Sequence, residues 1–375
     1  MPLPLIAVFA ELPDPRRETE NKLHLLGDVL VLATCAVLGG AESWDAIHEY
    51  GQTKKAFFRR FLTLPNGIPS ADTFERVFAK LDPQAFARAF GRWMSAACQA
   101  TGLIPIALDG KSVRGSKKAT ATGCLHLVSA WATEARLTLG QVSVPEGSNE
   151  IAVIPELLSV LELKGALVTL DAAGCQKAIA RRIREQGGDY LLAVKGNQPA
   201  LSAAVQQVFA DACEQDFAEV SHDGDASTGE GRGRCEERYV TVIRDPKGLP
   251  KGWADVAAVV QVNREREVGG KNTSSTHYYL TSHRGPAKEI AGWIRGHWGI
   301  ENGLHWILDV VFREDDSRKR AGHAGANLAM IRRVAVSLLR RAPGKASSVT
   351  KRLKAGWNDD YLLQILQGIT DDVVR

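Results

Sequence analysis

Apolar residues at helical spacing dominate the first hundred positions of the chain. Residues 23–38 form an apolar run of helical length, and residues 41–61 repeat large apolar side chains at helical intervals. Ser70 stands before the next such run, where its oxygen can accept a free N–H of the first helical turn. The pattern predicts an α-helical N-terminal domain over residues 1–98, which either binds DNA ends or caps the domain that follows.

After residue 102 the apolar runs shorten and alternate with helical patterns, which is typical of a sheet covered by helices. A mixed sheet with helices on its faces is therefore expected. The predicted strands span 103–108, 125–133, 137–144, 167–170 and 190–194, and the predicted helices span 151–163 and 176–186.

Residues 202–285 interrupt this alternation and predict a β-rich insertion. A Gly/Asp-rich loop is expected at 222–233, and three strand-like runs follow it. Helical patterns return over 287–341. The expected organisation is thus a helical domain, a catalytic domain over 99–341 that carries the insertion, and a basic C-terminal tail over 342–375.

Composition narrows the class of protein. The chain has 375 residues, of which 45% are hydrophobic and 24% are charged, and this excludes disordered and fibrous classes. Six cysteines lie apart without a CxxC pair, and no secretory signal opens the chain, so we expect a cytoplasmic protein with reduced thiols. The longest apolar stretch contains Asp28 and is shorter than the ~20 residues that a membrane span needs, so no membrane association is expected.

Positive charge is concentrated near the C-terminal end. The whole chain carries a formal charge of +4, yet residues 313–354 alone hold twelve Lys or Arg against three acidic residues. Such clustering suits a surface that contacts DNA phosphates, and it equally suits a solvated helix face.

Two carboxylates follow predicted strands directly. Asp109 ends the strand at 103–108 and Asp171 ends the strand at 167–170. Carboxylates at the rim of a sheet can hold divalent ions for phosphoryl transfer, because Mg²⁺ prefers oxygen ligands and two such ions stabilise attacking and leaving oxygens. A strand-end Asp can also cap the next turn, so the pattern alone leaves both interpretations open.

A third carboxylate, Glu301, lies in a segment rich in Trp and His. His297, Glu301 and His305 recur at four-residue spacing and so share one face of a helix. Three interpretations arise: a His/Glu metal site, a metal-bound Glu301 with His297 and Trp298 lining a substrate groove, or an aromatic core helix. The segment lacks the HExxH pattern of zinc proteases, and the second interpretation is preferred.

Several motifs in order give the chain a family resemblance. They are Leu-Asp-Gly-Lys at 108–111 with Arg114, Val-Thr-Leu-Asp-Ala at 168–172, Gly-Asp-Tyr-Leu-Leu-Ala-Val-Lys-Gly-Asn-Gln at 188–198, His-Trp-Gly-Ile-Glu-Asn at 297–302 and Leu-Asp-Val-Val-Phe-Arg-Glu-Asp at 308–315. With Leu-Pro-Asp-Pro-Arg-Arg at 12–17 and Ala-Glu-Ser-Trp at 41–44, the chain resembles DDE transposases of bacterial insertion sequences. It is most similar to the ISAs family, which includes the H-repeat-associated proteins of Rhs elements.

The resemblance implies an RNase H-like catalytic core whose DDE triad is Asp109, Asp171 and Glu301. The triad would hold two Mg²⁺ ions, for which Mn²⁺ would substitute. One departure concerns residues around the Glu, because Ile294, His297 and Leu308 stand where related transposases often have Tyr, Arg and Lys.

The implied activity is cleavage of double-stranded DNA at element ends, followed by joining of the freed 3′-OH to target DNA. A homodimer on DNA, in the nucleoid, is implied as well. The alternatives are a catalytically silent or domesticated DNA-binding relic, and a nuclease that cuts without joining. The expected DNA contacts are Lys111, Arg114, Lys195, Asn197, Gln198, Arg232, Arg234, His297, Trp298, Arg318 and Lys319.

Overall fold

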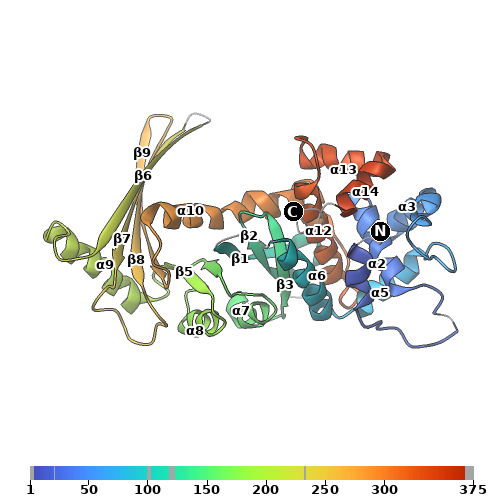
Figure 1. The fold of residues 1–375 in the computed structure, drawn as a ribbon, viewed down its shortest axis with the longest axis horizontal. Coiled ribbons are helices and arrows are strands. Elements are labelled where there is room, and N and C mark those ends of the chain that lie inside the picture. The colour runs from blue at the N-terminus through green and yellow to red at the C-terminus, as the bar shows by residue number, and fades with distance from the viewer. Residues whose placement is uncertain (1–3, 21, 99–102, 118–122, 232–233, 368–375) are drawn as a thin grey trace.

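The computed structural model describes residues 4–20, 22–98, 103–117, 123–231 and 234–367. The molecule is elongated, with helices of both chain ends at one extremity and a long β-sheet at the other (Figure 1). Helix α10 (Ala287–His297) lies between the two extremities beside the central strands.

The N-terminal region is helical, as predicted. Its helices are α1 (Pro4–Ala10), α2 (Leu26–Leu38), α3 (Trp44–Thr53), α4 (Lys55–Phe58), α5 (Ala71–Lys80) and α6 (Pro83–Ala97). The Ser70 side chain caps α5 by accepting the Thr73 N–H at 3.3 Å. The single helix expected over 41–61 is in fact two, because Lys54 leaves helical geometry between α3 and α4.

The central sheet confirms the predicted mixed α/β core of RNase H-like class. Its strands are β1 (Ile104–Val113), β2 (Leu125–Ala132), β3 (Leu137–Val144), β4 (Ala166–Leu170) and β5 (Asp189–Val194). They lie in the order β3-β2-β1-β4-β5, in which β1, β4 and β5 are parallel and β2 is antiparallel to its neighbours.

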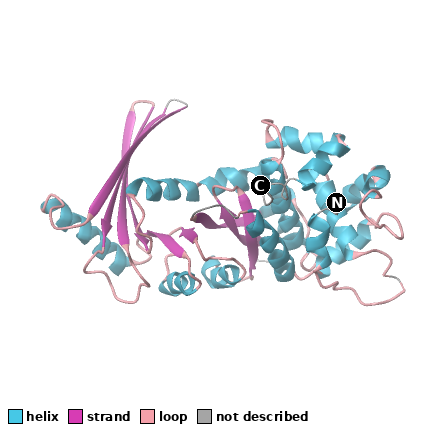
Figure 2. Cartoon of the chain, viewed as in Figure 1, coloured by secondary structure: helices cyan, strands magenta, loops and turns pink. Residues whose placement is uncertain are grey.

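Helices cover both faces of this sheet (Figure 2). On β3, Gly140 faces Leu157 of α7 (Glu150–Ser159), while the next residue, Gln141, donates to the Ala326 carbonyl of α12 (Ala324–Arg341). Since consecutive residues of a strand point to opposite faces, α7 and α12 lie on opposite sides. Helix α8 (Lys177–Glu185) packs beside α7.

The insertion extends the same sheet instead of forming a separate one. Helix α9 (Pro199–Glu214) leads into β6 (His222–Gly231), β7 (Arg234–Arg244), β8 (Ala258–Val268) and β9 (Lys271–Thr281). Strand β9 pairs antiparallel with β5, so nine strands are continuous in the order β3-β2-β1-β4-β5-β9-β8-β7-β6. The four added strands rise as a narrow curved ribbon at one end of the molecule (Figure 1).

The loop predicted at 222–233 is wrong over residues 222–231, which form β6. This strand pairs with β7 from His222 opposite Ile243 to Gly231 opposite Arg234. Its own residues show no alternation of apolar and polar side chains, because much of the hairpin is exposed on both faces. Residues 222–231 form a strand because they pair with β7, and this pairing cannot be seen in their own sequence pattern.

The segment predicted as a basic tail is folded over its described part. It forms α13 (Ser348–Trp357) and α14 (Asp359–Gln367). Arg352 of α13 is buried, and its Nε donates to the Val37 carbonyl of α2 at 3.2 Å, while Leu362 of α14 belongs to the main apolar core. The two ends of the chain therefore share one core. None of the helices in the described ranges has the length and apolar character of a membrane span.

The strands that carry Asp109 and Asp171 end differently. Asp171 directly follows β4, as predicted, but Asp109 lies inside β1 because that strand continues to Val113 in register with β2. The parallel pairing of β1 with β4 stops at Ala107 opposite Thr169. Beyond this point, one edge of β1 is free of β4, and Asp109 lies at the start of that edge.

Candidate active site

Glu301 lies in an irregular stretch of helix. After α10 ends at His297, the chain forms a π-helical turn over Glu301–His305 and then α11 (Trp306–Val310). A π-turn inserts an extra residue into a helix and so changes which side chains share a face; such turns are frequent at functional sites.

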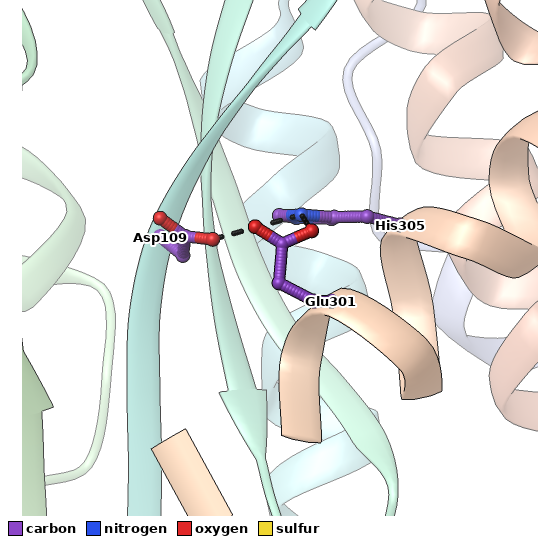
Figure 3. Close-up of side chains that lie close together, drawn as sticks. All are labelled: Asp109, Glu301 and His305. Carbon is purple, nitrogen blue, oxygen red and sulfur yellow. Dashed lines mark ion pairs between the residues drawn. The ribbon is translucent and has the colours of Figure 1, made fainter. Parts of the chain in front are cut away.

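The structure brings Asp109, Glu301 and His305 together (Figure 3). One ligand atom from each residue lies within 4.8 Å of the others. The Nδ1 atom of His305 is 3.6 Å from Oδ2 of Asp109 and 3.5 Å from Oε2 of Glu301. Strand β1 and the π-turn thus place two carboxylates and an imidazole around one point, which is a donor set suited to a divalent ion.

Burial and, to a smaller extent, the negative charges of Glu301, Glu150 and Asp171 together raise the pKa of Asp109 to about 7, against the opposing effect of the Gly110 N–H. Burial lowers the pKa of His305 to about 3, assisted by the positive charges of Arg333 and Lys111. A bound cation would reduce the electrostatic repulsion within such a cluster of carboxylates.

Asp171 does not belong to that three-residue group, but its charge acts on Asp109. Its Oδ1 accepts the N–H groups of Ala173 at 3.0 Å and Gly174 at 3.3 Å, so the side chain does cap the turn after β4. The cap is thus observed, and the metal-holding role of Asp171 stays a prediction that is compatible with it, because the second carboxylate oxygen, Oδ2, takes no part in these two bonds.

Two cavities meet at Asp171. One, of about 530 Å³, lies between α10 and the inserted strands and is lined by Lys195, His297 and Trp298 among others. The other, of about 800 Å³, lies on the far side of Asp171, and Lys319 and Arg320 line it. Basic side chains therefore contribute to the lining of both cavities that border this carboxylate.

His297 and Trp298 have different roles in the first cavity. His297 is buried and its Nδ1 lies 2.9 Å from Oγ1 of Thr169 on β4, and burial lowers its pKa to about 4. This neutral ring ties α10 to β4. Trp298 is 56% exposed and offers its ring to the cavity.

Lys111 is buried, which contradicts its predicted role as a DNA contact. Its Nζ lies 2.7 Å from Asp309, 3.2 Å from Asp315 and 3.9 Å from Glu314. Three carboxylates from a distant segment thus surround an ammonium group that is only 7% exposed. Lys111 positions that segment on β1 and has no free face for a phosphate.

Replacing Lys111 by Met is expected to destabilise the protein by about 2–3 kcal/mol, because it removes the buried ammonium group that pairs with the partly buried carboxylates of Asp309 and Asp315. Urea unfolding measures the change. The matched control is Arg114→Met, since Arg114 pairs with the same Asp315 but is 84% exposed, and its loss should cost less than about 1 kcal/mol. Equal stability losses in both variants would contradict the assignment.

The remaining predicted DNA contacts are spread over several elements. Lys195 and Arg318 are exposed, and the Lys319 ammonium lies over the Trp44 ring at 5.4 Å. Asn197 donates to the Ala172 carbonyl at 2.6 Å. Gln198 donates to the Cys175 carbonyl at 2.9 Å. These two amides hold the turn after Asp171. Arg232 lies outside the described residues, and Arg234 begins β7, far along the inserted ribbon.

Sequence reasoning did not select two neighbours of Asp109. His305 shares the four-residue spacing of His297 and Glu301, which was the available signal. Glu150 begins α7, and its Oε1 lies 2.7 Å from Nε2 of His126, whose Nδ1 is 2.8 Å from Oγ of Ser112. A Cβ at Gly110 would stand 2.0 Å from Oε1 of Glu150, so any other residue there would have to displace that carboxylate.

The chain matches two family models. Residues 101–338 match the model described as "Transposase DDE domain", and residues 6–94 match the one described as "DDE_Tnp_1-associated". The first match covers more than half of the chain and contains Asp109, Asp171 and Glu301. The protein belongs to the DDE transposase family.

Relatives in bacteria agree with this assignment. The protein named "Putative transposase YncI" of Escherichia coli O157:H7 is 37% identical, over 98% of this chain and 95% of its own length. "H repeat-associated putative transposase YhhI" of Escherichia coli strain K12 is also 37% identical, over 94% of this chain and 95% of its own. A solved piggyBac transposase synaptic complex with hairpin DNA is 9% identical, covers 98% of this chain and 78% of its own, and aligns with a TM-score of 0.40, too low to establish a shared fold.

Proposed function

We propose that this transposase cleaves DNA at the ends of its insertion sequence and joins those ends to target DNA. Phosphoryl transfer would depend on two divalent ions, Mg²⁺ or Mn²⁺, held by Asp109, Asp171 and Glu301. The observation that carries the proposal is the convergence of Asp109 and Glu301, 192 positions apart in the chain, beside Asp171 in the matched transposase domain.

The residues present fit such ions. Asp109 is held by β1, Glu301 by the π-turn and Asp171 by the turn after β4, so each comes from a different rigid element. Divalent ions at this place would stabilise the negative charge that develops on the transferred phosphoryl group. Asp109, close to Glu301 and influenced by the charge of Asp171, would be the carboxylate that contributes to holding both ions.

The two cavities at Asp171 would orient the DNA strand. Lys195 lines one and Lys319 the other, and both would contact phosphates, which position DNA without reading its sequence. Trp298 would pack against the nucleotide beside the scissile bond. Holding two element ends at once favours a homodimer on DNA, acting in the nucleoid.

The test is an assay of the purified protein with Mg²⁺ or Mn²⁺ and DNA that carries the native element ends. We expect cleavage and joining by the unchanged protein, and a loss of at least about a hundredfold in Asp171→Asn and Glu301→Gln. Glu289→Gln is the matched control for Glu301→Gln, because Glu289 lies on the exposed side of α10, and it should retain full activity.

The outcomes separate the alternatives. Cutting without joining would identify a nuclease. DNA binding without cutting under either ion would identify a domesticated relic. Full activity of Asp171→Asn or Glu301→Gln would remove that residue from the proposed triad.

A further inference from the structure

The imidazole of His305 is the least explained group near the proposed metal centre. Its residue is 5% exposed, and its Nε2 has no hydrogen-bond partner among the described residues. Its Nδ1 faces the oxygens of Asp109 and Glu301 at 3.6 and 3.5 Å, which is longer than the about 2.7–2.9 Å of a charge-assisted hydrogen bond. The contacts of Nδ1 are therefore too long for such hydrogen bonds, and they leave the distance that an ion between the ring and the two carboxylates would need.

The spacing of the three side chains suits ligands of one ion. Two ligands that each lie about 2.1 Å from a small divalent ion stand about 3.0–4.2 Å apart. The nitrogen–oxygen separations of 3.5 and 3.6 Å fall inside this range, and the whole group spans no more than 4.8 Å. Closing the widest pair requires only a small side-chain rotation.

A simple ion pair is a poorer account of the same contacts. An ion pair would bring Nδ1 to about 2.7–2.9 Å from one carboxylate oxygen. The observed atom instead stands almost equally far from both carboxylates, at 3.5 and 3.6 Å, as a nitrogen ligand of an ion shared with them would.

We propose that His305 is a nitrogen ligand of the ion bound by Asp109 and Glu301, so that this position prefers a first-row transition ion over Mg²⁺. The inference rests on the proposed metal-dependent function and deepens it. Imidazole favours borderline ions, whereas Mg²⁺ favours oxygen ligands throughout. Mn²⁺, Co²⁺ and Zn²⁺ should therefore bind here more tightly than Mg²⁺.

The test uses Mn²⁺ added to the full, metal-free chain without DNA. Pulsed electron paramagnetic resonance should detect coupling between Mn²⁺ and a histidine nitrogen, and the signal of free Mn²⁺ should give a Kd about tenfold or more below that for competing Mg²⁺. The nitrogen coupling should disappear in His305→Ala and in His305→Asp. His305→Asp should still bind Mn²⁺, with its preference over Mg²⁺ reduced to about threefold or less, because its ligands are all oxygen.

His297→Gln is the matched control, since His297 is a second buried histidine at the end of α10, and it should keep the nitrogen coupling. Coupling that persists in folded His305→Asp, or that is absent in the unchanged protein at saturating Mn²⁺, would overturn the inference. If nitrogen coupling is found but DNA is never cut, the proposed function fails and the ligand assignment stands. If DNA is cut without nitrogen coupling, the reverse holds.

Discussion

Asp109→Asn is expected to abolish DNA cleavage and, at the same time, to make the metal-free protein more stable above pH 7. The loss of activity should be at least about a thousandfold, because Asp109 is the carboxylate shared by both proposed ion positions. The gain in stability follows from burial, which together with three neighbouring carboxylates raises the pKa of Asp109 to about 7. Asn keeps the shape of the side chain and removes the buried charge.

The pH dependence has a definite sign. The folded protein holds the Asp109 proton up to about pH 7, whereas the unfolded chain releases it near the model value of 3.8. The stabilisation is fully present below pH 3.8 and is lost as the pH rises through about 7. Urea unfolding in the presence of a chelator should therefore show that the free energy of unfolding of Asp109→Asn, relative to that of the unchanged protein, increases between pH 5 and pH 8.

Two further measurements complete this test. Asp211→Asn is the control, because Asp211 lies exposed on α9 and should show no such gain. Mn²⁺ should raise the unfolding free energy of the unchanged protein and have little effect on Asp109→Asn. An Asn variant that is no more stable than the unchanged protein at pH 8 would show that the ionised Asp109 carboxylate does not destabilise the fold.

Arg333→Met is expected to lower the free energy of unfolding by about 3–5 kcal/mol, because it removes the hydrogen-bonded partner of the buried Glu314 carboxylate and leaves only Lys111, at 3.9 Å. Arg333 and Glu314 are both fully buried, and Nη1 of Arg333 lies 2.9 Å from Oε1 of Glu314. Its Nε donates to Oγ of Ser129 on β2 at 3.0 Å. The arginine therefore joins α12, the sheet and the segment after α11.

A double-mutant cycle distinguishes the pair from ordinary packing. Arg333→Met combined with Glu314→Leu should cost less than the sum of the single changes, because neither partner is left charged and alone. Arg88→Met on the exposed face of α6 is the control and should change stability by less than about 0.5 kcal/mol. Strict additivity in the cycle would contradict the buried pair.

Local patterns predicted the features that depend on neighbouring residues. The apolar run of β4 ends at Asp171 because both its period and its boundary are local, and Ser70 caps α5 for the same reason. The end of β1 was misplaced at Asp109 because its continuation to Val113 depends on pairing with β2. Long-range pairing overrides the polarity of a short segment.

The site shows the same division. Asp109, Asp171 and Glu301 could be named from motifs, and the structure supports the approach of Asp109 and Glu301. Lys111 was misassigned because its three carboxylate partners lie about two hundred residues away in the chain. His305 carried a spacing signal, yet only the approach of β1 to the π-turn shows which of the histidines on that helix meets the carboxylates.

Because of the π-turn, the orientation of Glu301 depends on the number of residues in this part of the helix. An α-helix advances about 100° per residue, so deleting one residue between Glu301 and His305 would restore regular geometry and rotate α10 by about that angle relative to α11. Glu301 would swing away from Asp109 while every other side chain of the site kept its identity. An in-frame loss of three nucleotides here is thus a route to inactivation that leaves all three carboxylates in the sequence. Counting acidic residues in a genome copy does not detect it, whereas counting the spacing from Glu301 to His305 does.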